Sequence, residues 1–477
     1  MDNHIKKFEP AEILRDIPKT ISNEPLIGKQ EFEAFYTPRI NEVRGMNRIQ
    51  TMKVGLEMSS PENPYKAFLM GHPGVGKSTE LTSLIKLIDD KFRAIRFSIT
   101  KDLDPLAFQP FDILLWMMIL ISERSASPVT EGGAGARPSD RLLQDIWDWF
   151  SVEKDTITKA TQLAAEASAG FGVSADSWWG KILGLFARLK GEFKFGQTRK
   201  KEKINYRLDR LSRLIQVSNR LVDECNDILK KNAKGRQWLF IGEDFDKDDA
   251  SNEKVKKFFV SYSRVLKSLR AHMIFTIPID LNYSDLSEKL PVPHSRRIIL
   301  PDIPVYQNDD DKSPHKVGRD AITELLKARV SPALFANNQM ERLIVASGGN
   351  FRDLFTMIEM AAIQAIIRNP KGKIEAPDAN VAISRMREIY KSKLGISRFD
   401  YTSIPYDKKV DRLLSIYFCK PGHDILDPVL FSLLRSRAVQ EFNGKQWFGV
   451  HPLVVDILVE QQKLRNPQGG EISGGTV

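Results

Sequence analysis

The sequence contains little cysteine and no long hydrophobic run. Its two cysteines, Cys225 and Cys419, lie far apart and lack the Cys-x-x-Cys or Cys/His spacing of a zinc site, which excludes a disulfide framework. The longest apolar run, Ile113–Ile121, is about half as long as a membrane-spanning helix, and the N-terminal residues lack the apolar stretch of a signal peptide. We therefore expect neither a transmembrane helix nor a signal peptide, and we expect a cytoplasmic protein.

The composition and the hydropathy of this chain are those of an ordinary globular protein. The 477 residues include 42% hydrophobic and 28% charged residues, which is typical of a folded protein of several domains. The formal net charge of +10 favours an anionic partner, but it does not choose among a nucleotide, a nucleic acid and a lipid surface.

A glycine-rich segment predicts a phosphate-binding loop (P-loop). An apolar stretch runs into Gly71-x-x-x-x-Gly76-Lys77-Ser78, and helix-forming sequence follows. In such a loop the backbone N–H groups surround the phosphates, the lysine reaches the β- and γ-phosphates, and the serine hydroxyl binds Mg²⁺. We therefore expect ATP and Mg²⁺ as cofactors, with nucleotide contacts from Gly71, His72, Pro73, Gly74, Val75, Gly76, Lys77, Ser78 and Thr79.

An apolar segment that ends in acidic residues predicts the partner of this loop. Residues 238–247 read WLFIGEDFDK, and a buried parallel strand would deliver its terminal carboxylates beside the phosphates. We assign Glu243 to Mg²⁺ and Asp244 to the attacking water, while Asp246 is expected to cap the next turn. The alternative is a solvated acidic loop after a core strand.

A second buried strand is predicted at His272–Ile277, and it places Thr276 at its end. There the hydroxyl would sense the γ-phosphate or hold a water molecule. Threonine is also simply common in strands, so this residue alone does not establish a site.

Four segments in order resemble the AAA-type and STAND-type ATPases, and most closely the bacterial relatives of the origin-recognition ATPases. They are GHPGVGKSTEL at 71–81, LFIGEDFDK at 239–247, MIFTIP at 273–278 and SGGNFRDLF at 347–355, within a resemblance that covers about residues 24–460. The resemblance implies an ATP-hydrolysing switch that forms homo-oligomers through its nucleotide sites.

The resemblance also implies roles for residues outside the P-loop. Ile27, in the segment EPLIGK, would contact adenine, and Arg352 would extend from the lid onto the γ-phosphate. Arg296 or Arg297 would be the arginine finger, a residue that completes the site of a neighbouring protomer, and we prefer Arg296. The alternatives are a surface turn for Ile27, a surface salt bridge for Arg352 and an ordinary basic turn for the arginine pair.

A helical insertion is predicted at about residues 122–235, because the chain between the second predicted strand and the acidic strand is far longer than one crossover connection. Within it, Trp178–Lys194 combines aromatic and basic residues. Burial against this chain or another protomer is favoured for that helix, while docking on a partner or on a membrane stays open.

The remaining boundaries follow from helix and hairpin patterns. We expect an adenine-side segment at 1–45, the ATPase core at 46–305, a helical lid at 306–395, a winged helix at 396–465 and a disordered tail at 466–477. Asn443-Gly444 marks the turn of the wing hairpin. The helix expected to read DNA is mostly apolar, with Arg435 and Arg437 only at its end, so protein contact is preferred over DNA contact.

The predicted fold class is α/β: a P-loop parallel sheet core with a helical insertion, a helical lid and a C-terminal winged helix. The predicted function is an ATPase switch that regulates a protein effector, plausibly in bacterial anti-phage defence. A DNA-associated ATPase, similar to origin-recognition or transposition regulators, is the alternative. An assembly that acts on membranes through the Trp178–Lys194 helix is a further alternative, and we regard membrane binding as the least favoured of the three.

Overall fold

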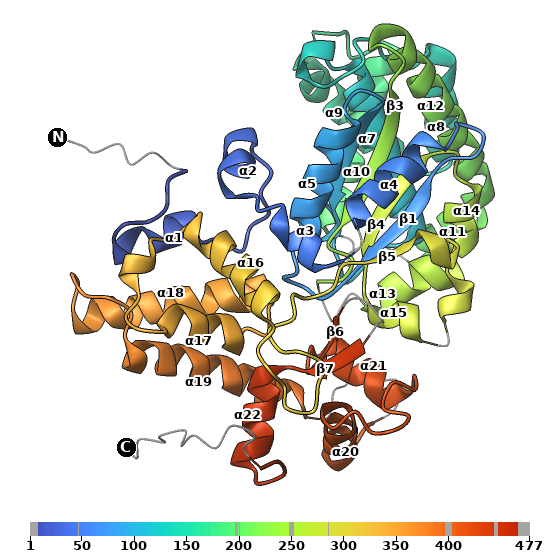
Figure 1. The fold of residues 1–477 in the computed structure, drawn as a ribbon. Coiled ribbons are helices and arrows are strands. Elements are labelled where there is room, and N and C mark those ends of the chain that lie inside the picture. Colours follow the sequence, from blue (N-terminus) through green and yellow to red (C-terminus); the bar gives the residue numbers. More distant parts are fainter. Residues whose placement is uncertain are drawn as a thin grey trace, which may run out of the picture.

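A five-stranded parallel sheet forms the centre of the molecule (Figure 1). The computed structural model describes residues 8–45, 47–170, 172–195, 199, 201–247, 252–284, 286–395, 403–442 and 447–465. The strand order is β2-β3-β4-β1-β5, with β1 at Lys66–Met70, β2 at Phe92–Ser98, β3 at Gln237–Glu243, β4 at His272–Ile277 and β5 at Arg297–Ile299. Because all strands are parallel, their carboxyl ends meet at one edge of the sheet. The predicted α/β fold class is confirmed.

The two faces of the sheet are covered by different helices. Along β1, Phe68 and Met70 join one hydrophobic cluster, whereas Ala67 and Leu69 join the other, as the two-residue period of a strand requires. The Ala67 face packs against α4 (Arg48–Glu57) and α5 (Lys77–Ile88). The Phe68 face packs against α7 (Pro110–Ala126), α12 (Leu211–Asn232), the π-helical turn η5 (Lys257–Ser261) and its flanking helices α13 (Asn252–Lys256) and α14 (Ser263–Ser268).

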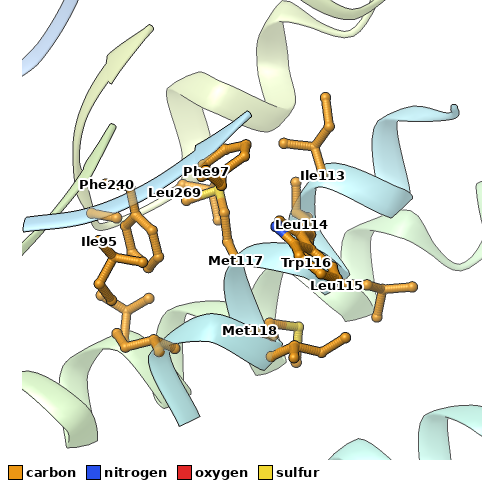
Figure 2. Packing of buried hydrophobic residues seen from close by; sticks show 14 of the residues in the cluster. Ile95, Phe97, Ile113, Leu114, Leu115, Trp116, Met117, Met118, Phe240 and Leu269 are labelled. Atoms are coloured by element: carbon orange, nitrogen blue, oxygen red, sulfur yellow. The ribbon is translucent and has the colours of Figure 1, made fainter. Parts of the chain in front are cut away.

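Residues 99–236 connect β2 to β3, and the insertion predicted at about 122–235 lies within this segment. Its helices are α6 (Ile99–Asp102), α7 (Pro110–Ala126), α8 (Asp140–Phe150), α9 (Lys154–Ala169), α10 (Trp178–Lys194), α11 (Lys201–Asp209) and α12 (Leu211–Asn232). The longest apolar run lies in α7, which is buried along most of its length. Figure 2 shows Met117 of α7 beside Phe97 of β2 and Leu269, so this run forms part of the protein core. Within the described ranges, no helix is both long enough and apolar enough to cross a membrane.

The tryptophan-led helix α10 is buried against its own chain. Trp179, Phe186 and Phe193 are each at most 2% exposed, and α10 packs along α9. At Gly184 the two helices are so close that an added Cβ atom would lie 2.2 Å from the Ala160 carbonyl oxygen. Burial against this chain or another protomer is favoured by the sequence for this helix, and the structure has burial against the same chain.

The lid packs together with the N-terminal segment. The lid helices are α16 (Lys316–Lys327), α17 (Gln339–Ala346), α18 (Phe351–Arg368) and α19 (Ala376–Lys393), and the N-terminal ones are α1 (Ile17–Thr20), α2 (Lys29–Phe35) and α3 (Arg39–Val43). Ala11 N donates to Arg329 O at 2.8 Å, and Ser331 N donates to Ala11 O at 2.9 Å. The N-terminal segment therefore extends from the lid to the sheet (Figure 1).

The C-terminal elements follow the order expected of a winged helix. They are α20 (Tyr406–Tyr417), α21 (Pro428–Arg435), β6 (Val439–Phe442), β7 (Trp447–Val450) and α22 (Pro452–Glu460), and β6 and β7 pair antiparallel. The short helix α15 (Asp280–Tyr283) contacts α21 from the core side. The predicted Asn443-Gly444 turn and the predicted tail at 466–477 lie outside the described residues.

Candidate nucleotide-binding site

The P-loop connects β1 to α5 at the carboxyl edge of the sheet. Gly71 has φ +144°, and a Cβ atom there would lie 2.3 Å from the Leu300 carbonyl oxygen. Gly74 has φ +96°, and a Cβ atom would lie 2.6 Å from Cβ of Arg352. A side chain would clash with the segment after β5 at the first position and with the lid at the second, so the loop packs in this way only because both residues are glycine.

Lys77, the first residue of α5, folds back over this loop. Its Nζ donates to Gly71 O at 2.7 Å and to His72 O at 2.9 Å. Nζ also forms an ion pair with Asp246 Oδ2 at 2.7 Å, in which the lysine side chain is 7% and the aspartate side chain 4% exposed. Asp246 thus lies inside the site, a position that the expected role as a turn cap did not include.

Asp244 leaves the end of β3 with φ +70°, which turns its side chain away from the strand's regular alternation. Its backbone N donates to Thr276 Oγ1 at 3.0 Å, so the two residues predicted at neighbouring strand ends do meet. Burial alone would raise the pKa of Asp244, but hydrogen bonds from Lys247 and Ser98 outweigh burial and lower it. The carboxylate is therefore ionised at neutral pH.

Glu243 does not line this cavity. Its carboxylate accepts a hydrogen bond from Arg96 Nε at 2.7 Å, and Arg96 Nη2 donates to the backbone oxygen of Ser78 at 3.2 Å. The sheet face that α5 covers receives every second residue of β3, namely Leu239, Ile241 and Glu243. On that face Glu243 meets Arg96 of β2. The predicted direct role of Glu243 at Mg²⁺ is thus corrected, because Asp244 and Asp246 line the cavity instead.

The lid closes the opposite side of the site. Arg352, the second residue of α18, lines the cavity together with Gly74 and Ser78. Burial, followed by the neighbouring Arg437, lowers the pKa of Arg352, while Asp246 opposes this change. Asn350, the N-cap of α18, donates from Nδ2 to Pro73 O at 3.0 Å. The lid is therefore hydrogen-bonded directly to the P-loop.

The N-terminal segment forms the remaining wall, but not through the predicted residue. Ile27 is 56% exposed and lies outside the cavity lining, whereas its neighbour Leu26 is buried and lines the cavity. The backbone N of Leu26 donates to Thr79 Oγ1 at 3.3 Å. Leu26 therefore replaces Ile27 as the apolar contact of this segment.

His72 is also placed differently from the prediction. Its ring lies 2% exposed, with Nδ1 at 2.7 Å from Asp302 Oδ2, and its side chain does not line the cavity. Burial on its own would raise the pKa of Asp302, but His72 and Asn350 hold that pKa below its usual range. His72 thus contributes its backbone carbonyl to Lys77, while its ring anchors the loop to the segment after β5.

The arginine pair lies at the other end of β1. The Arg296 guanidinium stacks 5.2 Å from the centre of the Tyr65 ring, just before β1 begins. Arg297 donates from Nε to Val292 O at 3.1 Å and from Nη1 to Ser287 Oγ at 2.8 Å. Neither arginine lines the cavity of its own chain, and the action of Arg296 on a neighbouring protomer stays a prediction.

The sequence places Arg437 at the end of the expected DNA-reading helix and gives no signal for its contact with the P-loop. Arg437, at the start of the wing, has φ +63° and is 9% exposed. Its Nη1 donates to Asp353 Oδ1 at 3.0 Å and to Pro73 O of the P-loop at 3.4 Å. Buried among these groups, Arg437 ties the winged helix to both the lid and the P-loop.

Of the known proteins compared with this chain, only solved structures are similar to it. No family model matches the chain, and no curated protein matches it. The solved structures with similarity include the Orc1 protein of Aeropyrum pernix in complex with DNA, at 11% identity and a TM-score of 0.36, which covers 92% of this chain and 96% of that one. They also include Cdc6p of Pyrobaculum aerophilum, at 13% identity and a TM-score of 0.33, with 87% and 93% covered.

Proposed function

We propose that this chain binds ATP with Mg²⁺ and hydrolyses it to ADP and phosphate. One observation carries the proposal: a glycine cradle, its lysine, two carboxylates and a lid arginine line a single cavity where the parallel strands end. This edge of a parallel sheet is where phosphate ligands meet helix N-termini. Gly74 leaves room for Asn350 and Arg352 of the lid beside the loop, and Ser78 and Asp246 supply oxygen ligands of the kind that Mg²⁺ prefers.

In this proposal each side chain has a separate task. The N–H groups of the loop and Lys77 hold the β- and γ-phosphates, and Ser78 holds the metal. Bound Mg²⁺ supplies charge neutralisation on the phosphate oxygens. Asp244 orients the attacking water and accepts its proton, and Thr276 fixes Asp244 through the backbone N. Arg352 brings the lid onto the γ-phosphate and stabilises the charge that develops there.

Lys77→Ala tests the binding step. We expect the variant to lose most of the rise in melting temperature that Mg-ATP gives the wild type, because a ligand that binds the folded state stabilises it. Lys91→Ala is the matched control, since that lysine lies beyond the far end of α5, where its side chain is 53% exposed. If Lys77→Ala keeps the full shift, the P-loop proposal is wrong.

The biological use of this activity is a separate proposal with two candidates. A DNA-associated ATPase is supported by the net charge of +10. Regulation of a protein effector, as in anti-phage defence, is the other candidate. It is favoured because α21, the helix that would read DNA, has Leu430, Leu433 and Leu434 buried, and because Arg437 is also buried within the chain. DNA affinity measured across a salt series separates the two, because phosphate contacts weaken steeply with salt. The membrane alternative is dropped, since the apolar face of α10 is buried.

A further inference from the structure

The ammonium group of Lys77 has three N–H donors, and all three have partners in the structure. Two of them bond to the carbonyl oxygens of Gly71 and His72. The third faces Asp246 Oδ2 at 2.7 Å. The two carbonyls belong to the P-loop itself, so they hold the lysine over the cradle. The donor directed at Asp246 is therefore the one that a phosphate oxygen would need.

Asp246 is held in this position by its neighbours in the chain. Phe245 is 1% exposed and packs edge-on against Phe259 and Phe275, with ring centres 5.2 and 5.5 Å away. This aromatic anchor fixes the turn after β3, and Asp244 and Asp246 on either side of it both line the cavity. Asp246 also interacts electrostatically with Arg352. The buried carboxylate of Asp246 thus interacts with both Lys77 and Arg352, the two cations that the proposed function assigns to the phosphates.

We propose that Asp246 is a built-in competitor of the nucleotide phosphates for Lys77. The inference rests on the proposed function and adds a regulation of the same site. A phosphate that binds Lys77 must displace the carboxylate, and the two anions repel each other at close range. Mg²⁺ offsets this repulsion, because its charge attracts both the carboxylate and the phosphates. Asp246 therefore makes nucleotide binding depend strongly on Mg²⁺.

The test compares ATP and ADP affinities by calorimetry, in excess EDTA and in excess Mg²⁺. We expect Asp246→Asn to bind either nucleotide in EDTA at least tenfold more tightly than the wild type, a difference of about 1.4 kcal/mol. Asp244→Asn is the matched control: it removes the same charge from the same cavity, but its carboxylate pairs with Lys247. We expect Asp244→Asn to bind nucleotide in EDTA less than threefold more tightly than the wild type.

A double variant assigns the effect to Lys77. In Lys77→Ala the added Asp246→Asn change should give no further gain, because the contested donor is gone. Equal affinities of wild type and Asp246→Asn in EDTA would overturn the proposal, and so would an equal gain in Asp244→Asn. Loss of Mg-ATP binding without any gain in EDTA would make Asp246 a metal ligand only. Failure of the wild type to bind Mg-ATP would instead refute the proposed function itself.

Asp246→Ala, checked for folding by circular dichroism, provides a second variant. It removes the carboxylate without leaving an amide that could accept from Lys77. We expect the same direction of change in EDTA as for Asp246→Asn. If both variants fold like the wild type and neither gains affinity, Asp246 does not compete with phosphate.

Discussion

Two consecutive carboxylates at the end of β3 have different surroundings. Glu243 is bound by Arg96 on the face that α5 covers, whereas Asp244 lines the cavity and is bound by Ser98, Thr100 and Lys247. We expect Asp244→Asn to keep Mg-ATP affinity within a few fold but to lower the hydrolysis rate by about 10²-fold or more, as loss of a general base does. Phosphate release in single turnover measures the rate, and equilibrium binding measures the affinity.

Glu243→Gln serves as the comparison. We expect it to lower the free energy of unfolding by about 1–3 kcal/mol, because the largely buried Arg96 loses its charged partner, while ATP affinity changes little. Urea unfolding followed by circular dichroism measures this. If Glu243→Gln instead traps Mg-ATP and Asp244→Asn hydrolyses normally, the two carboxylates have the opposite roles.

At the scale of residues, the sequence predicts those contacts that a local pattern encodes. The P-loop follows from glycine spacing, and the places of Asp244 and Thr276 at strand ends follow from two apolar segments; the contact between the two residues was not predicted. The position of Glu243 on the sheet face that α5 covers also had a signal, since Leu239 and Ile241 alternate onto the same face. Asp246 had none, because its partner Lys77 lies 169 positions away and only the folded sheet brings them together.

At the scale of elements, two glycines of α10 have opposite surroundings: one lies at the crossing with α9, and the other faces open space. Gly184 faces the Ala160 carbonyl at the helix crossing, whereas a Cβ atom at Gly191 of the same helix would meet nothing within 4 Å. We expect Gly184→Ala to destabilise the protein by about 1–3 kcal/mol through overpacking. Gly191→Ala should leave stability unchanged or raise it by up to about 1 kcal/mol, because alanine favours helix.

Urea unfolding of the two variants gives a direct comparison, since the substitution and the helix are the same. Equal effects of the two substitutions would show that the α9–α10 crossing is looser than described. The sequence predicted α10 as a helix and favoured its burial, because the apolar residues recur at helical spacing. It could not predict α9 as the partner, because the close approach depends on which small residues meet in space.

At the scale of the whole molecule, the winged helix, the lid and the P-loop share one polar network. Arg437 reaches Pro73 and Asp353, Gln440 donates to Gly348 O at 3.0 Å, and His451 lies 3.1 Å from Ser347 O. The order of these parts along the chain was predictable from motif order. Their contacts were not, because they join residues more than 80 positions apart. The domain boundaries given above stay predictions.

Assembly is tested at the same scale. If Arg296 completes the site of a neighbouring protomer, Arg296→Ala should bind ATP normally but hydrolyse it poorly. Mixing it with Lys77→Ala, each inactive alone, should restore part of the activity, because mixed interfaces pair an intact pocket with an intact arginine. The finger can contribute about 10³-fold or more, so sparse mixed interfaces are measurable. A mixture that stays inactive, while sedimentation shows that the variants co-assemble, rules out Arg296 as the finger.

The strand order also governs how this chain can fold while a ribosome makes it. The first strand pairs only with the fourth and the fifth, and the second pairs first with the third, so no pair of the sheet can form before residue 237 has been synthesised. The first strand then waits for residue 272, about 200 residues after its own end. At about 5–20 residues per second, this delay lasts roughly 10–40 s. Helix α7 ends at residue 126, and its partners β2 and β3 can pair only once residue 243 has been made. At the same rate, roughly 6–23 s pass in which this apolar helix has no sheet to cover it on the nascent chain.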